Sequence, residues 1–306
     1  MMKRRDRLMK TSAAIGALAL VASVGLMNVT AGDAFATTKV INAKENKTLH
    51  NELPAAIKKS GVINGVSIID PPYFYYNSAG NKTEGLTLGL AKAIGQVLGV
   101  KVTTVVAGSA AQEEAGIVDN KYQIQLAPGG DTTTFEQTYD VIDWLKEYVS
   151  FAVAKGNPDN IAGLASLCGH TIGTIAGGSA VLILESQSTA CTSQGSQAIT
   201  ISTFLDQADV MLALTSGRVD AAFSSQVPLQ YYIAQSGGSI QLDHGVGGNG
   251  YANEDLGWFL PKGSKLGPIF VKAFTQLRAD GIYQALLANW NVQNDGMTAF
   301  KLNASG

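Results

Sequence analysis

Charged residues are scarce in this sequence, and no long run of like charge occurs. Only 15% of its 306 residues are Asp, Glu, Lys or Arg, while 46% are hydrophobic. The formal net charge is −2 at pH 7. A chain without a basic stripe or an acidic tail lacks the features of a nucleic-acid-binding protein and of a disordered one. We therefore expect no nucleic-acid partner, and a hydrophobic content large enough to fill two globular lobes.

Metal-binding and catalytic motifs are missing as well. The three histidines are not paired at the spacing of metal ligands. No Gly-x-Ser-x-Gly, His-Glu-x-x-His or phosphate-loop pattern occurs either. We therefore expect a protein that binds no metal, needs no cofactor and is not an enzyme.

The first 36 residues have the three parts of a secretory signal peptide. The apolar stretch Ala13–Met27 precedes Ala34-Phe35-Ala36, which has the small-x-small pattern of a cleavage site, and the positive start contains Lys3, Arg4, Arg5, Arg7 and Lys10. A retained membrane anchor is the less favoured alternative, since Gly16 and Gly25 weaken a short apolar stretch. Cleavage removes five cations and two anions, which changes the formal charge from −2 to −5.

Two cysteines, Cys168 and Cys191, follow this segment. An even pair in an exported chain predicts a disulfide rather than a metal site. No cysteine directly follows Ala13–Met27, so we expect no lipid anchor. Because a freely diffusing exported protein needs an outer barrier to retain it, we expect a periplasmic monomer. Arg4-Arg5 leaves both the general and the twin-arginine export routes open.

Strand and helix patterns alternate along the mature chain. Val62–Ile69 and Lys101–Val106 are rich in β-formers, whereas Leu86–Leu98 has apolar residues at helical spacing. The alternation starts again with a strand at His170–Thr174 and a helix at Val181–Gln187. Repeated β-α-β units predict parallel sheets with helices on both faces, and ligands at the carboxyl ends of the strands. The sequence therefore predicts an α/β protein with two such sheets.

Four aromatic residues, Tyr73, Phe74, Tyr75 and Tyr76, follow the break at Pro71-Pro72. Alternation along an extended loop turns two rings inward and two outward. With Tyr73 and Tyr75 inward, the loop forms an aromatic lid over a flat or cationic ligand group. The alternative is a local packing cluster.

Two further strand ends carry candidate ligand contacts. Gly130 and Asp131 follow a predicted strand, and Asp131 either caps the helix after it or faces the ligand with its charge. Thr132 offers its hydroxyl for either purpose. Gly178 and Ser179 begin a predicted helix, where free amides form either an anion site or an ordinary helix start.

Five segments, in order, resemble the family 3 extracellular solute-binding proteins, which serve ABC importers of polar amino acids. They are Lys59–Val62 through Pro71-Pro72-Tyr73-Phe74, Asp131–Gln137 with Val141–Trp144, Leu167–Gly173 with Gly177-Gly178-Ser179, Leu214–Ala222, and Arg278–Tyr283 through Trp290. The resemblance covers about residues 59–291.

The resemblance implies a type II periplasmic-binding-protein fold, a Venus flytrap of two lobes joined by two hinge strands. Lobe 1 would comprise residues 37–150 and 255–306, and lobe 2 residues 151–254. The implied function is to capture a small polar solute by hinge closure and to deliver it to an ABC permease in the inner membrane.

Two positions depart from the family pattern. Gln137 stands where the resemblance implies an arginine for the ligand's carboxylate, and Ser225 where it implies an aspartate for the ammonium. Both charge anchors of a free amino acid are thus replaced by neutral groups, so we expect a neutral pocket and an atypical ligand. A polar uncharged molecule, an organic cation and a modified amino acid all fit this expectation.

Two alternative functions use the same scaffold. A periplasmic enzyme of the cyclohexadienyl dehydratase type would need a carboxylic acid aimed into the cleft, for which Asp131 and Glu136 are the candidates. A sensory ligand-binding module would need a membrane tether or a receptor partner.

Overall fold

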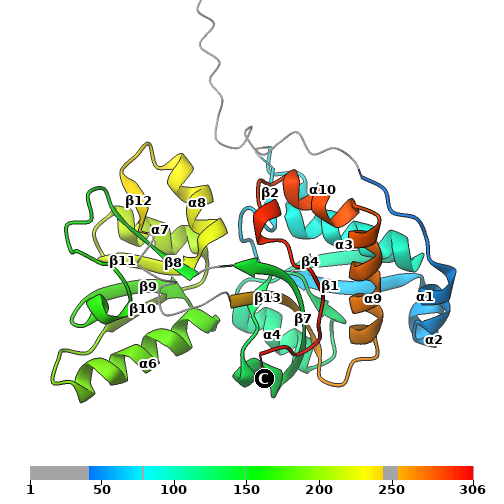
Figure 1. Cartoon of the computed structure of the whole chain (residues 1–306), viewed down its shortest axis with the longest axis horizontal. Coiled ribbons are helices and arrows are strands. Elements are labelled where there is room, and N and C mark those ends of the chain that lie inside the picture. The colour runs from blue at the N-terminus through cyan, green and yellow to red at the C-terminus, as the bar shows by residue number, and fades with distance from the viewer. Residues whose placement is uncertain (1–40, 78, 148, 244–253, 306) are drawn as a thin grey trace, which may run out of the picture.

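The structure, a computed structural model, describes residues 41–77, 79–147, 149–243 and 254–305 (Figure 1). The predicted signal peptide, residues 1–36, lies outside these ranges. Two α/β bodies lie side by side, which confirms the predicted fold class. We call them lobe 1, with strands β1–β7 and β13, and lobe 2, with strands β8–β12. The exact boundaries at 150/151 and 254/255 stay predictions.

Lobe 1 contains a parallel and an antiparallel three-stranded sheet. The parallel sheet has the order β4-β1-β5, and the antiparallel sheet the order β6-β13-β7. The strands are β1 (Val62–Ser67), β2 (Tyr75–Tyr76), β3 (Thr83–Glu84), β4 (Lys101–Val106), β5 (Ile124–Gln125), β6 (Gly129–Gly130), β7 (Tyr139–Glu147) and β13 (Glu254–Pro261). The helices are α1 (Lys47–Glu52), α2 (Ala55–Ser60), α3 (Leu86–Leu98), α4 (Ala110–Val118), α5 (Thr133–Glu136), α9 (Leu266–Ala279) and α10 (Ile282–Ala288), with the short 3-10 turn Gln293–Asp295.

Helix α3 shows how local sequence fixes these elements. It lies between Gly85, with φ 140°, and Gly99, with φ 64°, and both dihedral angles favour glycine over other residues. Its buried side packs against α9. Nearby, Trp144 and Trp258 are fully buried with ring centroids 5.7 Å apart. Both tryptophans belong to the same buried hydrophobic core as residues of α3 and α9.

Lobe 2 contains a single five-stranded sheet with the order β10-β9-β11-β8-β12. Its elements are β8 (Val149–Ala154), the 3-10 turn Leu164–Leu167, β9 (Thr171–Ile175), α6 (Ser179–Ser193), β10 (Thr200–Phe204), α7 (Gln207–Thr215), β11 (Ala221–Ser225), α8 (Gln226–Gln235) and β12 (Ile240–Asp243). Strands β10, β9 and β11 are parallel, whereas β8 is antiparallel to β11 and β12 to β8. The sheet is therefore mixed. Strand β8 can run antiparallel to β11 because it follows β7 of lobe 1 directly, without a crossover helix.

Cys168 and Cys191 form the predicted disulfide, with an S–S distance of 2.01 Å. The bond joins the segment before β9 to helix α6 within lobe 2. Within the described ranges, no helix combines the length and apolarity that a membrane crossing requires.

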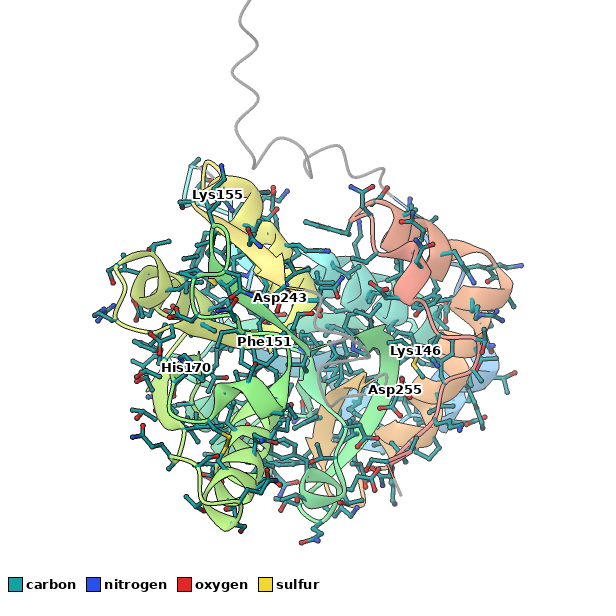
Figure 2. All side chains as sticks on the ribbon, turned by 60° about the vertical axis from the view of Figure 1, so that its left-hand side comes forward. Lys146, Phe151, Lys155, His170, Asp243 and Asp255 are labelled. Atoms are coloured by element: carbon teal, nitrogen blue, oxygen red, sulfur yellow. A yellow bond between two sulfur atoms is a disulfide. The ribbon has the colours of Figure 1, made fainter. Side chains whose placement is uncertain are left out.

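The two lobes are joined through β7 and β8 and through β12 and β13 (Figure 1). Residue 148 in the first connection and residues 244–253 in the second lie outside the described ranges. Beside these connections, Lys146 on β7 is paired in register with Asp255 on β13, and Phe151 on β8 with Asp243 on β12 (Figure 2).

Candidate functional site

A cavity lies between the lobes and is lined by both of them. Counted with its open mouth, it measures about 710 Å³. Its lining comes from lobe 1 with Ile68, Asp70, Ala110, Glu113, Glu114, Gln125, Ala127, Pro128, Gly129, Gly130, Phe135, Leu256 and Phe259, and from lobe 2 with Val149, Thr174, Ile175, Gly178, Ser179, Ala180, Ser224 and Ser225. Several of these residues follow the carboxyl ends of β1, β5, β9 and β11, where the sequence predicts ligand contacts.

Four of the predicted site residues line this cavity: Gly130, Gly178, Ser179 and Ser225. Gly178 is the N-cap of α6, and Ser179 is the first residue of that helix. Gly178 has no side chain to cap the helix, and the Val181 N–H of the first turn donates to the Gly178 carbonyl at 3.0 Å. Ser225 ends β11 at the start of α8.

The two predicted lid tyrosines lie outside the cavity lining. Tyr73 is 1% exposed and packs edge-on against Trp144 in the core of lobe 1, with ring centroids 6.4 Å apart. Tyr75 is half-buried and packs edge-on against Trp290 at 6.1 Å. Tyr73 lies within a tight turn in which the Phe74 N–H donates a hydrogen bond to the Asp70 carbonyl. The chain is therefore not extended at this point, and the alternation expected of an extended loop does not apply to Tyr73.

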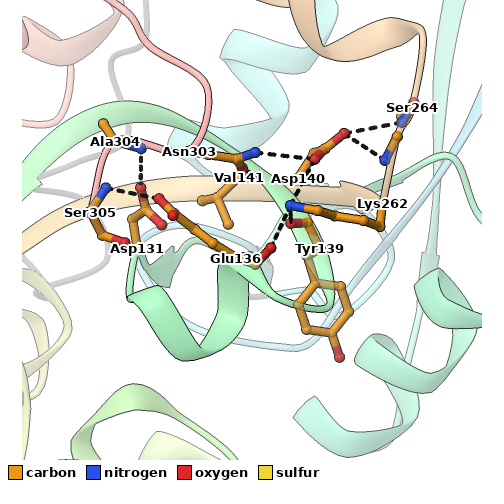
Figure 3. Close-up of polar contacts among 11 residues, drawn as sticks. Asp131, Glu136, Tyr139, Asp140, Val141, Lys262, Ser264, Asn303, Ala304 and Ser305 are labelled. Carbon is orange, nitrogen blue, oxygen red and sulfur yellow. Dashed lines mark hydrogen bonds and ion pairs between the residues drawn. The ribbon is translucent and has the colours of Figure 1, made fainter.

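Asp131 and Thr132 also lie outside the lining. The Thr132 hydroxyl accepts a hydrogen bond from the Phe135 N–H at 3.2 Å and so caps α5. The Asp131 carboxylate accepts one from the Ala304 N–H at 2.9 Å (Figure 3). Asp131 therefore does not cap α5, whose N-cap is Thr132, and it holds the C-terminal segment instead; its contact with a ligand stays a prediction.

Glu136 and Gln137, at the end of this turn, do not line the cavity, whereas Phe135 does. Glu136 accepts a hydrogen bond from the Ser305 N–H at 2.8 Å, and its backbone carbonyl accepts one from the Lys262 ammonium (Figure 3). Gln137 is exposed at the end of α5 and does not line the cavity. The short α5, four residues long, leaves this position on the outer surface of lobe 1.

Three carboxyl groups that sequence reasoning did not select line the lobe 1 side. Burial, together with the Asp206 carboxylate, raises the pKa of Asp70 from 3.8 to about 7. Burial raises the pKa of Glu114 from 4.5 to about 7. The lining therefore contains three ionisable carboxyl groups, which the expectation drawn from Gln137 and Ser225 did not include.

Glu113 is the most deeply placed of the three, with 0% exposure. Burial raises its pKa well above 4.5, and the charges of Glu114 and Asp70 add to the rise. The Ala127 and Ile68 amides lower the pKa in part, but neither carboxylate oxygen reaches hydrogen-bonding geometry with a described partner. Desolvation without full compensation is the physical cause of the shift.

A periodicity argument could have identified Glu113. Ala110, Glu113 and Ile117 stand three and four residues apart on one face of α4, and all three are buried. A glutamate on the apolar face of a helix that follows a strand end is the available signal. Asp70, just beyond the end of β1, could have been found from strand-end placement alone.

A second group of carboxyls lies outside the cavity, next to the connection between the lobes. Burial raises the pKa of Asp143, and the Asp131 and Asp255 carboxylates raise it further. Burial raises the pKa of Asp255, whereas Lys146 and Lys301 lower it. The register pairing of Lys146 with Asp255 brings the opposite charges together across the strands (Figure 2).

One further cluster lies on lobe 2, outside the cavity lining. The possible ligand atoms of Asp159, His170 and Asp220 lie within 4.8 Å of one another. The Nδ1 atom of His170 is 3.3 Å from Asp220 Oδ2, which also accepts a hydrogen bond from the Thr171 N–H. Asp220 thereby ties the start of β9 to the segment before β11.

Comparison with known proteins gives concordant results. The family of bacterial extracellular solute-binding proteins, family 3, matches residues 62–293. The chain is 26% identical over 252 residues to the arginine-binding protein ArgT of Corynebacterium glutamicum, covering 79% of this chain and 78% of the relative.

Solved structures share the fold. The amino acid ABC transporter substrate-binding protein AbpA of Streptococcus pneumoniae, bound to L-arginine, matches with a TM-score of 0.68 and 17% identity over 78% of this chain and 99% of its own. An ancestral amino acid-binding protein, a precursor of cyclohexadienyl dehydratase, matches with a TM-score of 0.66 and 22% identity over 79% and 99%. At these identities the likeness carries the fold alone.

Proposed function

Because the chain belongs to family 3 of the bacterial extracellular solute-binding proteins, we propose that it captures a small amino-acid-like or amine solute between its lobes and delivers it to an ABC importer. The observation that carries the proposal is the cavity whose lining is shared by both lobes. A solute held there touches lobe 1 through Asp70 and lobe 2 through Ser179. Its extra contacts in the closed state are what would favour closure.

The lobe 2 wall suits the polar end of such a solute. Ser179, Ser224 and Ser225 line this wall, and the Ser224 hydroxyl, which donates to Gln207 Oε1 at 2.6 Å, can still accept a hydrogen bond from the solute. The named curated relative binds arginine, which is compatible with a solute that carries nitrogen donors. Of the residues predicted for the site, we retain Gly130, Gly178, Ser179 and Ser225 as ligand contacts.

Delivery is the second part of the proposal. The closed form would dock on a permease in the inner membrane, after export and removal of residues 1–36. The protein would act there as a periplasmic monomer. An ABC transporter substrate-binding protein with the same fold supports this assignment by analogy.

A thermal-shift screen of the mature chain tests solute binding. Amino acids, amines, organic acids and small sugars are added in turn, and the melting temperature is recorded. A solute that binds the folded state raises the melting temperature according to its concentration relative to its Kd. A panel in which no solute raises it would contradict the proposal.

An enzymatic function is the second candidate, because the cavity holds a buried carboxyl group. Burial raises the pKa of Glu113 well above 4.5 and so favours its protonated form, the form that a general acid requires. Asp131 and Glu136, the acids named from the sequence, do not line the cavity. Incubation with prephenate or arogenate separates the two functions: the binding function predicts no product, and turnover would establish the enzyme.

A further inference from the structure

The lobe 1 wall of the cavity contains acceptor atoms without donors. Asp70 is 8% exposed and Gln125 is 4% exposed, and both line the cavity. Asp70 Oδ1 and Gln125 Oε1 have no hydrogen-bond partner among the described residues. A buried acceptor without a donor is costly, so a solute that donates hydrogen bonds to these atoms gains more than one that only accepts.

The same wall contains carboxyl groups without a basic side chain beside them. Asp70, Glu113 and Glu114 line the cavity, and none of the described lining residues is Lys, Arg or His. An ionised carboxyl in this wall therefore has no cationic side chain beside it in the lining. Burial favours the protonated form of these carboxyls in the empty cavity, and a cation that enters it favours their ionised form.

We propose that the solute is an organic net cation, whose protonated amine or guanidinium group binds the wall formed by Asp70, Glu113, Glu114 and Gln125. This inference rests on the proposed solute-binding function. It goes further, since it makes positive charge, rather than an amino-acid backbone, the feature that is recognised. Guanidinium and ammonium groups carry several donors and full charge, which matches three carboxyls and an amide oxygen.

The rest of the lining favours an organic cation over a metal ion. Ile68, Ile175 and Leu256 contribute apolar walls, and the rings of Phe135 and Phe259 lie on the lobe 1 side. An aliphatic stem can lie against such surfaces while its charged end reaches the carboxyls.

Charge recognition is coupled to closure through groups on the other lobe. Asp206, the N-cap of α7 in lobe 2, raises the pKa of Asp70 in lobe 1, so the two carboxyls repel each other across the cleft. Burial, followed by the charges of Asp70 and Asp206, raises the pKa of Tyr232 on α8. A cation between the lobes removes this repulsion, and a neutral solute does not. The cation thus stabilises the closed state selectively.

Isothermal titration calorimetry on the mature chain tests the proposal with matched probes. Arginine is compared with citrulline, its uncharged isostere, and with agmatine, which keeps the guanidinium but lacks the carboxylate. Glutamate and calcium chloride serve as anion and metal arms. We expect arginine or agmatine to bind at least tenfold more tightly than citrulline, and the ratio of arginine to agmatine then tells a cationic amino acid from an amine.

Two variants assign the effect to the acidic wall. Glu113→Gln and Asp70→Asn should each weaken the binding of the cationic probe at least tenfold. Because both carboxyls are desolvated, their amides should melt no lower than the parent, which separates lost binding from lost folding. Glu185→Gln is the matched control, because it removes one exposed charge from α6 outside the cavity lining and should leave the affinity unchanged.

Opposite outcomes separate the two proposals. If citrulline or glutamate binds as tightly as arginine and agmatine, or if calcium alone binds, the organic-cation proposal is overturned while solute binding stands. The same holds if both wall variants keep the parent affinity. If no probe binds and none of the solutes of the thermal-shift panel raises the melting temperature, both the organic-cation proposal and the proposed solute-binding function are contradicted.

Discussion

Tyr75 of lobe 1 and Tyr231 of lobe 2 lie with their ring centroids 6.0 Å apart and so form an aromatic contact between the lobes. Tyr75 packs against Trp290 on its own lobe, and Tyr231 packs against Tyr232 on the other. Burial, followed by the influence of Tyr231 and Glu84, raises the pKa of Tyr75 to about 12. The residue expected to cover the ligand is thus placed to hold the lobes together.

Removing one ring of this contact should favour the open state. An aromatic pair contributes about 1 kcal/mol beyond the area it buries, so Tyr231→Ala should weaken solute binding by about fivefold. The loss should appear as faster dissociation in stopped-flow or surface-plasmon measurements. Tyr76→Ala is the control, because the neighbouring ring is 48% exposed. An equal loss in both variants would contradict the role assigned to Tyr231.

The stability of the solute-free protein should fall as the pH rises. The pKa values of Asp70 and Glu114 are raised to about 7 in the folded state, and that of Glu113 is raised as well. A group with a raised folded pKa contributes its full stabilisation below the unfolded pKa, near 4, and loses it as the pH rises through the folded value. For Asp70, the rise from 3.8 to about 7 corresponds to about 4 kcal/mol.

Thermal unfolding followed by circular dichroism checks this dependence. The melting temperature without solute should decrease between pH 5 and pH 8, and Asp70→Asn should flatten the decrease. The Asp131 and Asp143 carboxyls, whose pKa values are also raised by burial, should contribute a part that persists in that variant. A melting temperature that stays level or climbs with pH would contradict the assignment of raised pKa values.

Binding of a cation should have the opposite pH dependence. The cation requires ionised carboxyls, so its affinity should rise as the pH passes through about 7, and binding should release protons. Asp70 is faced by Asp206 and Tyr232, and Glu113 by Glu114 and Asp70. Glu114 in turn raises the pKa of Tyr139 on β7. These neighbours are acidic or neutral, so none of them reverses the sign.

Calorimetric titrations with agmatine in buffers of different ionisation enthalpy measure the proton release directly. At pH 7, the observed enthalpy should depend on the buffer, with a positive number of protons released. In Glu113→Gln that number should be smaller. Proton uptake, or an enthalpy independent of the buffer, would count against the acidic wall as the binding surface.

Gln137 should have little influence on binding. The family resemblance placed it at the carboxylate-binding position, yet its side chain is exposed and lies outside the cavity lining. We expect Gln137→Ala to change the affinity of the cationic probe by less than about twofold, within the range of surface substitutions. A loss of tenfold or more would restore the role implied by the resemblance.

The sequence predicts the framework well where local signals are strong. The limits of α3 and β4 agree with the predicted Leu86–Leu98 and Lys101–Val106. Gly85 and Gly99 mark the ends of the helix, and after Gly99 the helical spacing of apolar residues gives way to a run of β-formers. Helix α6 is longer than the predicted Val181–Gln187, since its second half is rich in Ser and Thr and shows no apolar face. Such a segment is helical through its place in the fold rather than through its pattern.

The site is less predictable because the motif positions and the charged positions are different residues. The glycine turn at Gly178 and the strand end at Ser225 line the cavity, as expected. The ionisable groups, however, are Asp70 and Glu113, which belong to no motif, and only the fold brings the strand ends and the inner face of α4 together. Tertiary placement, which periodicity alone does not give, decides what the pocket recognises.

Small-angle scattering of the mature chain tests most directly whether a cation closes the lobes. Profiles are recorded without solute, with saturating arginine or agmatine, and with citrulline at the same concentration. Closure by charge predicts a smaller radius of gyration with the cationic solute and an unchanged one with citrulline. Identical profiles in all three conditions, despite measured binding of the cation, would contradict the account.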